Sequence, residues 1–336
     1  MVRALLIFLF CSVPVMAAED LILGLPTSRI DYQSIDPAAR RLYIAKMGAD
    51  QLVVVDLQQM KVVAQLPGFA KITGVLAVPE LRKVYVSVPG SGVGASLGLA
   101  LGKLGLSSGK GAVAVLSSDD FHEITRLPGL VFPDGIAYDP KERRIFVSDE
   151  KGAEIIVIDA DKDQLIDRVK LGGEVGNVRY DPVTDRVYAA SQSRNELAFI
   201  DPKSLAVQAS SLIDCQHPHG LFIAPDHPIG YVACDGNDRL LTVDLNDGKI
   251  LDQKPLGHEP DVLDADADTH RLYVASESGK LSGFDISDPE RPKAVGDLMI
   301  GGNAHSVAVD PATHFLYLPI ADQDGHAVLK VLNPPF

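Results

Sequence analysis

The sequence lacks tryptophan, contains only three cysteines and, beyond its N-terminal segment, has no long apolar run. Because a membrane-spanning helix needs about 20 consecutive apolar residues, we expect no transmembrane segment in the rest of the chain. The net charge is −14, and the Lys and Arg residues form no cluster, which argues against a nucleic-acid partner. We expect the excess of acidic residues to favour solubility.

Two motifs of well-known catalytic or cofactor sites are also absent. The sequence has no Gly-x-Ser-x-Gly, so a serine hydrolase of that type is not indicated. It has no Cys-x-x-Cys-His, which excludes covalent attachment of c-type haem and leaves open haem held without a covalent bond by His217 or His219. No cofactor is therefore certain. Besides such a haem, the sequence leaves open a divalent metal.

The N-terminal segment, 1–18, has the layout of a secretory signal peptide. Arg3 precedes an apolar stretch over residues 4–13, and the small residues Ala17 and Ala18 follow. The apolar stretch is too short to cross a bilayer. We therefore expect cleavage near Ala17 or Ala18 and export of residues 19–336 to the periplasm or out of the cell.

Two cysteines, Cys215 and Cys234, would remain after that cleavage, because Cys11 lies in the signal peptide. In an oxidising compartment an even pair of cysteines predicts a disulfide. A Cys–His metal site and two free thiols are the alternatives that the sequence leaves open.

Internal repetition predicts the fold. Seven segments each contain an apolar strand, an Asp-Pro-like turn and a strand of the Leu-Tyr-Val kind, as in "PDGIAYDPKERRIFVSD" over 133–149. The turn residue falls at positions 36, 78, 139, 181, 224, 266 and 310, so that all but one of the intervals are nearly equal. Such a period, about 42 residues, is typical of a four-stranded β-propeller blade. We therefore predict an all-β, seven-bladed propeller as a single domain over 19–336.

The two ends of the chain are expected to complete one blade together. After the seventh repeat, "HAVLKVLN" (326–333) supplies a third strand and the sequence stops. At the other end, "DLILGLP" (20–26) is one strand too many. Pairing of the two would close the ring and remove an open sheet edge, which otherwise invites aggregation.

The repeats also resemble those of a known family. "PATHFLYLPI", "TDRVYAAS" and "HRLYVAS" look like the repeats of YVTN-type periplasmic seven-bladed propellers, and the resemblance covers essentially the whole of residues 19–336. It implies a fold and a compartment more than an activity, because the recurring residues are structural. Many such relatives are described only as binding or repeat proteins, so function has to be argued from the site.

One position in each repeat stands at the start of the innermost strand. Strands alternate in direction within a blade, so these seven positions share one face of the propeller with the loops between the second and third strands. The positions are Asp31, Thr73, Asp134, Gly176, His219, Asp261 and His305. Because the ring closes, four of them belong to consecutive blades: His219, Asp261, His305 and Asp31.

Imidazole and carboxylate groups together suit a divalent metal and also proton transfer. We therefore predict a ligand site at this channel mouth. Its candidate residues are Asp31, Asp134, His217, His219, His258, Asp261 and His305. A metal would be bound by His219, Asp261, His305 and Asp31. The structural alternative is a hydrated polar rim that binds nothing specific.

Two classes of function fit such a mouth. The first, which we favour, is a monomeric binding module for a small molecule, a peptide or a periplasmic protein. The second is a metal-dependent hydrolase, lactonase or lyase, with His219 or His305 as the catalytic base and carboxylates holding the ion.

The one longer interval, between positions 78 and 139, marks an insertion over 89–111 in the second blade. Its ends are rich in Gly and Ser, and its centre, 95–106, is apolar. We expect the insertion to project from the face that carries the mouth. It could be a lid over a ligand, a docking patch for a partner or a membrane surface, or a loop packed on the rim.

Overall fold

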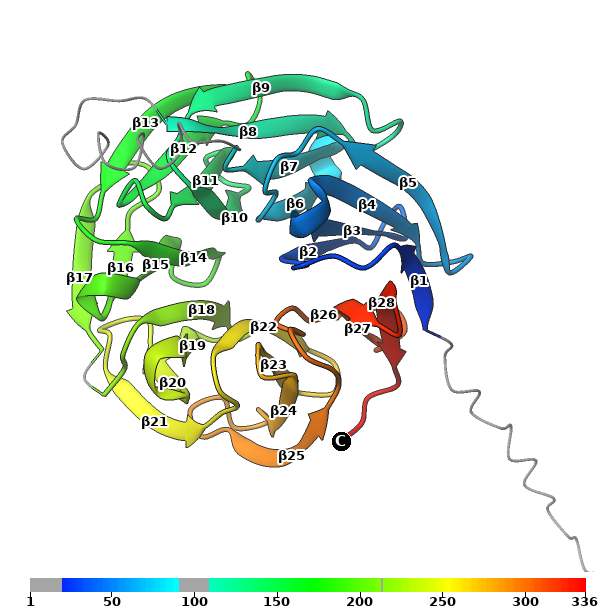
Figure 1. The fold of residues 1–336 in the computed structure, drawn as a ribbon. Helices are drawn as coiled ribbons and strands as arrows, with labels where there is room; N and C mark the ends of the chain where they lie inside the picture. The colour runs from blue at the N-terminus through cyan, green and yellow to red at the C-terminus, as the bar shows by residue number, and fades with distance from the viewer. Residues whose placement is uncertain (1–19, 91–108, 213) are drawn as a thin grey trace, which may run out of the picture.

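The computed structural model of this protein describes residues 20–90, 109–212 and 214–336. The predicted signal peptide and residues 91–108 of the insertion lie outside these ranges. Seven sheets, each of four antiparallel strands, stand around a common axis (Figure 1). The predicted seven-bladed propeller with four strands per blade is therefore confirmed.

The first four blades follow one another along the chain. Blade 1 contains β2 (Gln33–Asp36), β3 (Arg41–Lys46), β4 (Gln51–Asp56) and β5 (Lys61–Pro67). Blade 2 contains β6 (Val75–Val78), β7 (Lys83–Val88), β8 (Gly109–Ser117) and β9 (Glu123–Gly129). Blade 3 contains β10 (Pro133–Asp139), β11 (Arg144–Asp149), β12 (Glu154–Asp159) and β13 (Gln164–Lys170). Blade 4 contains β14 (Val175–Asp181), β15 (Arg186–Ser191), β16 (Glu196–Ile200) and β17 (Val207–Ser211).

The last three blades complete the ring. Blade 5 contains β18 (Pro218–Ile223), β19 (Ile229–Cys234), β20 (Arg239–Asp244) and β21 (Ile250–Pro255). Blade 6 contains β22 (Pro260–Asp266), β23 (Arg271–Ser276), β24 (Lys280–Asp285) and β25 (Lys293–Met299). Blade 7 contains β26 (Ala308–Val309), β27 (Leu316–Gln323), β28 (His326–Leu332) and β1 (Leu21–Gly24). Short 3-10 turns lie at η1 (Met47–Ala49), η2 (Pro79–Leu81), η3 (Gln192–Arg194) and η4 (Asp235–Asn237), and none of the described helices is long and apolar enough to cross a membrane.

The core lies between neighbouring blades. The second strand of each blade is buried on both faces, whereas outer strands such as β5 alternate between more and less exposed residues, as expected for a sheet with one face in solvent. The aromatic residue of the Leu-Tyr-Val strand is fully buried in every blade, as a tyrosine in six and as Phe146 in blade 3. Large aromatic side chains at one repeated position thus fill the spaces between the sheets.

The N-terminal strand closes the ring as predicted. β1 pairs antiparallel with β28, with Leu21 opposite Leu329 and Ile22 opposite Val328. At the turns between the first and second strands of these blades, Arg40 of blade 1 makes two hydrogen bonds, of 2.6 and 2.7 Å, to the carboxylate of Asp310 in blade 7. Backbone pairing and a bidentate ion pair therefore both stabilise the junction between blade 7 and blade 1.

Substitutions on the two faces of β1 test how much this closure contributes to stability. Leu23 is fully buried and Ile22 is 56% exposed. We expect Leu23→Ala to lower the free energy of unfolding by about 2–4 kcal/mol, because it leaves a cavity in the core. Ile22→Ala, the matched control on the same strand, should change it by less than about 0.5 kcal/mol. Urea denaturation of both variants checks this, and equal effects would mean that β1 packs loosely.

Candidate ligand site at the channel mouth

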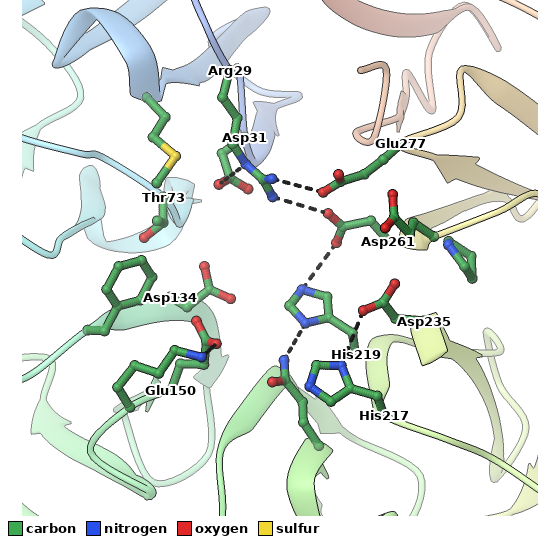
Figure 2. Close-up of a pocket in the computed structure, with 16 residues that line it drawn as sticks. Arg29, Asp31, Thr73, Asp134, Glu150, His217, His219, Asp235, Asp261 and Glu277 are labelled. Atoms are coloured by element: carbon green, nitrogen blue, oxygen red, sulfur yellow. Dashed lines mark hydrogen bonds and ion pairs between the residues drawn. The ribbon is translucent and has the colours of Figure 1, made fainter. Parts of the chain in front are cut away.

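A cavity of about 380 Å³ lies at one end of the propeller axis. Two kinds of loop contribute to it: those before the innermost strands and those after the second strand of a blade. Of the predicted residues, Asp31, Asp134, His217, His219 and Asp261 line this cavity (Figure 2). Repetition of one structural position in neighbouring blades thus gathers side chains that are far apart in the sequence.

Arg29, two residues before Asp31, binds three carboxylates in the mouth. Its guanidinium lies 2.8 Å from Glu277 and 3.6 Å from Asp261 (Figure 2). Its Nε lies 3.3 Å from Asp31. Burial alone would lower the pKa of Arg29, but these three carboxylates raise it above its usual value. Arg29 is therefore a permanent cation that joins blade 1 to blade 6.

His219 lies against Asp261 on the neighbouring blade. Its Nε2 is 3.1 Å from Asp261 Oδ1, and its Nδ1 contacts the side-chain amide of Gln192 (Figure 2). Burial would lower the pKa of His219, but the charge of Asp261 and its hydrogen bond, together with the charges of Asp134 and Glu150, raise the pKa to about 10. The carboxyl of Asp261 shows the converse: burial would raise its pKa, and His219 with the nearby cations lowers it. The two groups thus favour a charged pair.

His305 lies behind Asp261 and is fully buried. Its Nε2–H donates to the backbone carbonyl of Ile30, and its Nδ1 lies 3.2 Å from Glu277 Oε1 and 3.8 Å from Asp261 Oδ2. Burial would lower the pKa of His305, but the hydrogen bond to Glu277, together with the charges of Asp261 and Asp31, raises it overall. The same bond lowers the pKa of Glu277. His305 therefore supports the carboxylates of the mouth from behind and does not line the cavity.

Asp134 has the most unusual environment in the mouth. It is 4% exposed, and within the described residues the one side chain that hydrogen-bonds its carboxyl is Tyr32, at 3.2 Å. The Tyr32 hydroxyl also accepts a hydrogen bond of 2.7 Å from Asn177. Burial, followed by repulsion from Asp31, raises the pKa of Asp134 to about 8. Tyr32 thus reaches from blade 1 to blades 3 and 4 and forms the floor under this carboxyl.

Close backbone contact brings the neighbouring inner strands together. Gly220 follows His219, and a Cβ atom there would lie 1.9 Å from the backbone oxygen of Asp261. Gly74 has the same relation to Asp134. Only glycine leaves room for the next blade at these points, so these residues set the spacing of the mouth.

The other predicted site residues are His217, His258 and the pair Cys215 and Cys234. The Nδ1 of His217 lies 3.2 Å from Asp235, inside the cavity (Figure 2). The side chain of His258 is 71% exposed, contacts Asp238 and does not line the cavity. Cys215 and Cys234 are joined by a disulfide between the loop before β18 and the end of β19. The disulfide therefore anchors the loop that carries His217.

The potential metal ligands in the mouth differ from the predicted set. Asp261, Glu277 and His305 offer atoms that lie within 4.8 Å of one another, whereas His219 and Asp31 are not part of this cluster. Arg29 already contacts both of its carboxylates. A divalent ion at this point would have to displace that guanidinium, so the donor set suits a metal poorly.

A second ring of positions, not predicted from the sequence, also contributes to the mouth. The residue directly after the second strand also faces the mouth, as Met47, Glu150, Gln192, Asp235 and Glu277 do. The same alignment of repeats would have identified them, since each follows a strand of the Leu-Tyr-Val kind. Arg29 lies outside this pattern. Its position two residues before Asp31 was the one feature of the sequence that indicated a place near the mouth.

Comparisons with known proteins establish the fold and not the activity. No protein-family model and no curated protein matches the sequence. The structure is similar to Kuenenia stuttgartiensis hydrazine synthase, with 15% identity, a TM-score of 0.75 and coverage of 96% of this chain and 99% of that one. It is similar to streptogramin B lyase, with 11% identity, a TM-score of 0.72 and coverage of 93% and 96%. It is also similar to the WD40 repeats of RRP9, with 8% identity, a TM-score of 0.72 and coverage of 93% and 100%.

These similarities define the class as a WD40-like, seven-bladed β-propeller. Solved structures of this class include a lyase as well as WD40 repeat proteins. Because one fold serves different functions, the mouth itself has to decide between them. The narrower resemblance to YVTN-type propellers stays a prediction.

The contact between His305 and Glu277 predicts a measurable pKa shift. Replacing Glu277 by Gln removes the largest of the interactions that raise the pKa of His305, while burial still lowers it, so this pKa should fall by at least about one unit. Asp235→Asn is the control, because Asp235 contacts His217 and not His305. NMR titration of the histidine side chains checks this. An unchanged pKa in Glu277→Gln would mean that the two groups do not interact.

Proposed function

We propose that this protein is an exported binding module whose mouth binds a small organic cation carrying an amine or guanidinium group. The observation that carries this proposal is the charge of the cavity. Within the described residues, seven Asp or Glu residues and two Lys or Arg residues line it. A cavity of about 380 Å³ lies in the range of small-molecule sites. Such a surplus of negative charge in a partly closed space favours a positively charged ligand.

The carboxylates are not equally available to a ligand. Asp31, Asp261 and Glu277 already contact Arg29, and Glu150 lies 2.5 Å from Lys151. Among the described residues, Asp134 has no Lys, Arg or His nitrogen within 4.0 Å, although Asp31 and Glu150 act on it electrostatically. A ligand cation beside Asp134 would supply the missing positive charge. We therefore assign Asp134 as the main anchor, with Asp31 and Glu150 beside it.

Export is part of the proposal. The disulfide between Cys215 and Cys234 supports it, because such bonds persist in oxidising compartments. The segment that would act as the signal peptide lies outside the described residues. Mass determination of the protein recovered from the periplasm or the medium would test both export and cleavage near Ala17 or Ala18.

Binding of agmatine and ethylguanidinium tests the ligand class. Calorimetry should detect both, whereas ethylurea, the neutral analogue of ethylguanidinium, should not bind. Asp134→Asn should weaken binding by roughly 10-fold or more, because it removes a charge-assisted hydrogen bond. Asp252→Asn is the control, since Asp252 pairs with Lys254 on an outer strand of blade 5. Equal binding of ethylurea and ethylguanidinium would contradict the proposal.

The pH dependence of binding follows from the pKa of Asp134. This carboxyl is mostly protonated below its pKa of about 8, so a cation has to displace a proton there. Affinity for ethylguanidinium should therefore rise roughly tenfold per pH unit up to about pH 8 and then level off. In Asp134→Asn the profile should be nearly flat. A wild-type profile that falls with rising pH would contradict the assignment of Asp134.

A lyase or hydrolase is the second candidate function. It is favoured by two groups that line the same cavity with shifted pKa values: the carboxyl of Asp134, with its pKa raised to about 8, and the imidazole of His219, with its pKa raised to about 10. Elemental analysis of protein purified without chelators separates its metal-dependent form from the binding module. Because Arg29 contacts the candidate ligands, we expect well below one metal ion per chain. A stoichiometric metal that is lost in Glu277→Gln would favour the enzyme instead.

A further inference from the structure

A second cavity, of about 720 Å³, occupies the axis on the other side of Tyr32. The inner strands of all seven blades line it, and it reaches the turns at Pro37, Pro79 and Pro311. Its wall is mainly apolar, with Leu76 and Phe222 among its larger side chains. Tyr32 lines this cavity and its hydrogen-bond partner Asp134 lines the mouth, so the bond between them marks the place where the two cavities adjoin.

One repeated position places a side chain from every blade on this wall. It lies two residues before the turn residue that defines the repeat. Four blades carry an apolar residue there: Leu76, Ala137, Phe222 and Ala308. The other three blades carry Ser34, Arg179 and Asp264. The ring therefore contains one cation and one carboxyl, and among the described residues the cavity has one further carboxylate, Glu80 at the turn after β6.

Ser34 and Asp264 have the same structural role. The Ser34 hydroxyl accepts a hydrogen bond of 3.0 Å from the backbone N–H of Ala77, on the inner strand of the next blade. Asp264 Oδ2 accepts one of 2.7 Å from Val309, at the equivalent position one blade further on, and Oδ1 accepts one of 2.9 Å from Ala265. Both side chains thus link neighbouring inner strands. Both carboxylate oxygens of Asp264 therefore accept hydrogen bonds from backbone N–H groups, and Asp264 forms no ion pair with Arg179.

Arg179 has no comparable structural role. One of its N–H groups donates to its neighbour, the carbonyl of Val178, at 3.1 Å. Within the described residues, no carboxylate oxygen lies within 4.0 Å of its guanidinium, whereas most other arginines there have such a partner. Burial lowers the pKa of Arg179, as expected for a cation that lacks a close counter-ion. Most of the five donors of this guanidinium are therefore available to a ligand in the cavity.

We propose that the axial cavity is a second binding site, which takes an organic anion with a single carboxylate on an apolar body. The carboxylate would bind the guanidinium of Arg179, whose planar geometry suits two parallel hydrogen bonds. The apolar body would contact the wall formed by residues such as Leu76 and Phe222. The two ends of the axis thus select ligands of opposite charge, and this site does not depend on the function proposed for the mouth.

Binding of 2-naphthoate and octanoate, with their amides as neutral counterparts, tests the proposal. Calorimetry on the full exported chain should detect both acids and show at least tenfold weaker binding of the amides. Arg179→Met keeps the length of the side chain and removes its charge. It should weaken binding of the acids by at least about tenfold and leave that of the amides unchanged. Arg194→Met, at an exposed arginine of the same blade that pairs with Glu196, is the matched control.

Two further measurements keep the test decisive. Asp235→Asn, in the mouth, should leave binding of the acids unchanged, because Asp235 lines the mouth and not the axial cavity. Removing an unpaired charge from the apolar cavity should leave the melting temperature of Arg179→Met unchanged or higher. If Arg179→Met does not fold, the comparison of acids with amides in the native protein decides. The proposal is overturned if neither acid binds at about 5 mM, if the amides bind equally well, or if Arg179→Met binds the acids as the native protein does.

Discussion

Pairing of β1 with β28 is the interaction on which the rest of this structure depends. A propeller blade cannot bury its apolar faces alone, so the ring is stable only when the last blade also contacts the first. Closure does more than remove a sheet edge. Arg29 and Asp31 lie in the connection between β1 and β2, and pairing of β1 with β28 helps to place this connection beside Asp261 and Glu277 of blade 6. The seam that completes the fold therefore also completes the mouth.

Charge determines what each end of the axis can bind. Carboxylates from four blades would repel one another in the mouth if Arg29 did not lie among three of them. Arg29 compensates only part of this charge, and no Lys, Arg or His nitrogen of the described residues lies within 4.0 Å of Asp134. Beyond the floor formed by Tyr32 the situation reverses, because in a mainly apolar cavity Arg179 has no carboxylate of the described part of the chain within 4.0 Å. Like-charged or unpaired groups are costly to bury, and a ligand of the opposite charge would remove that cost.

The sequence predicted the fold well because the fold is repeated. The spacing of the turn residues gave the number of blades, and the extra strand over 20–26 gave the closure. The same alignment located Asp31, Asp134, His219 and Asp261 around one mouth, because the start of each inner strand has the same environment in every blade. His305 belongs to that ring but lies behind Asp261, where it contacts the carbonyl of Ile30 and the carboxylate of Glu277. The inner strand of its blade, β26, is short and begins only at Ala308.

Other parts of the site could not be predicted in this way. Arg29 lies in the connection between β1 and β2, a segment that no other repeat contains, so alignment could not identify its contacts with Glu277 and Asp261. His258 lies in the loop before the inner strand of blade 6, from which it could have reached the mouth, but it contacts Asp238 and its side chain is 71% exposed. Pattern identifies equivalent backbone positions, whereas side-chain direction depends on the particular neighbour that each residue meets.

Chemical rescue of Arg29→Ala tests most directly whether the mouth is built to hold cations. The variant removes the internal cation and leaves Asp31, Asp261 and Glu277 to repel one another, so its melting temperature at pH 7 should fall. Millimolar ethylguanidinium should restore a large part of that loss, and ethylurea should not, because only the cation replaces the missing charge. If ethylguanidinium raises the melting temperature of Arg29→Ala no more than that of the native protein, or if ethylurea acts equally well, the account of the mouth as a cation site is wrong.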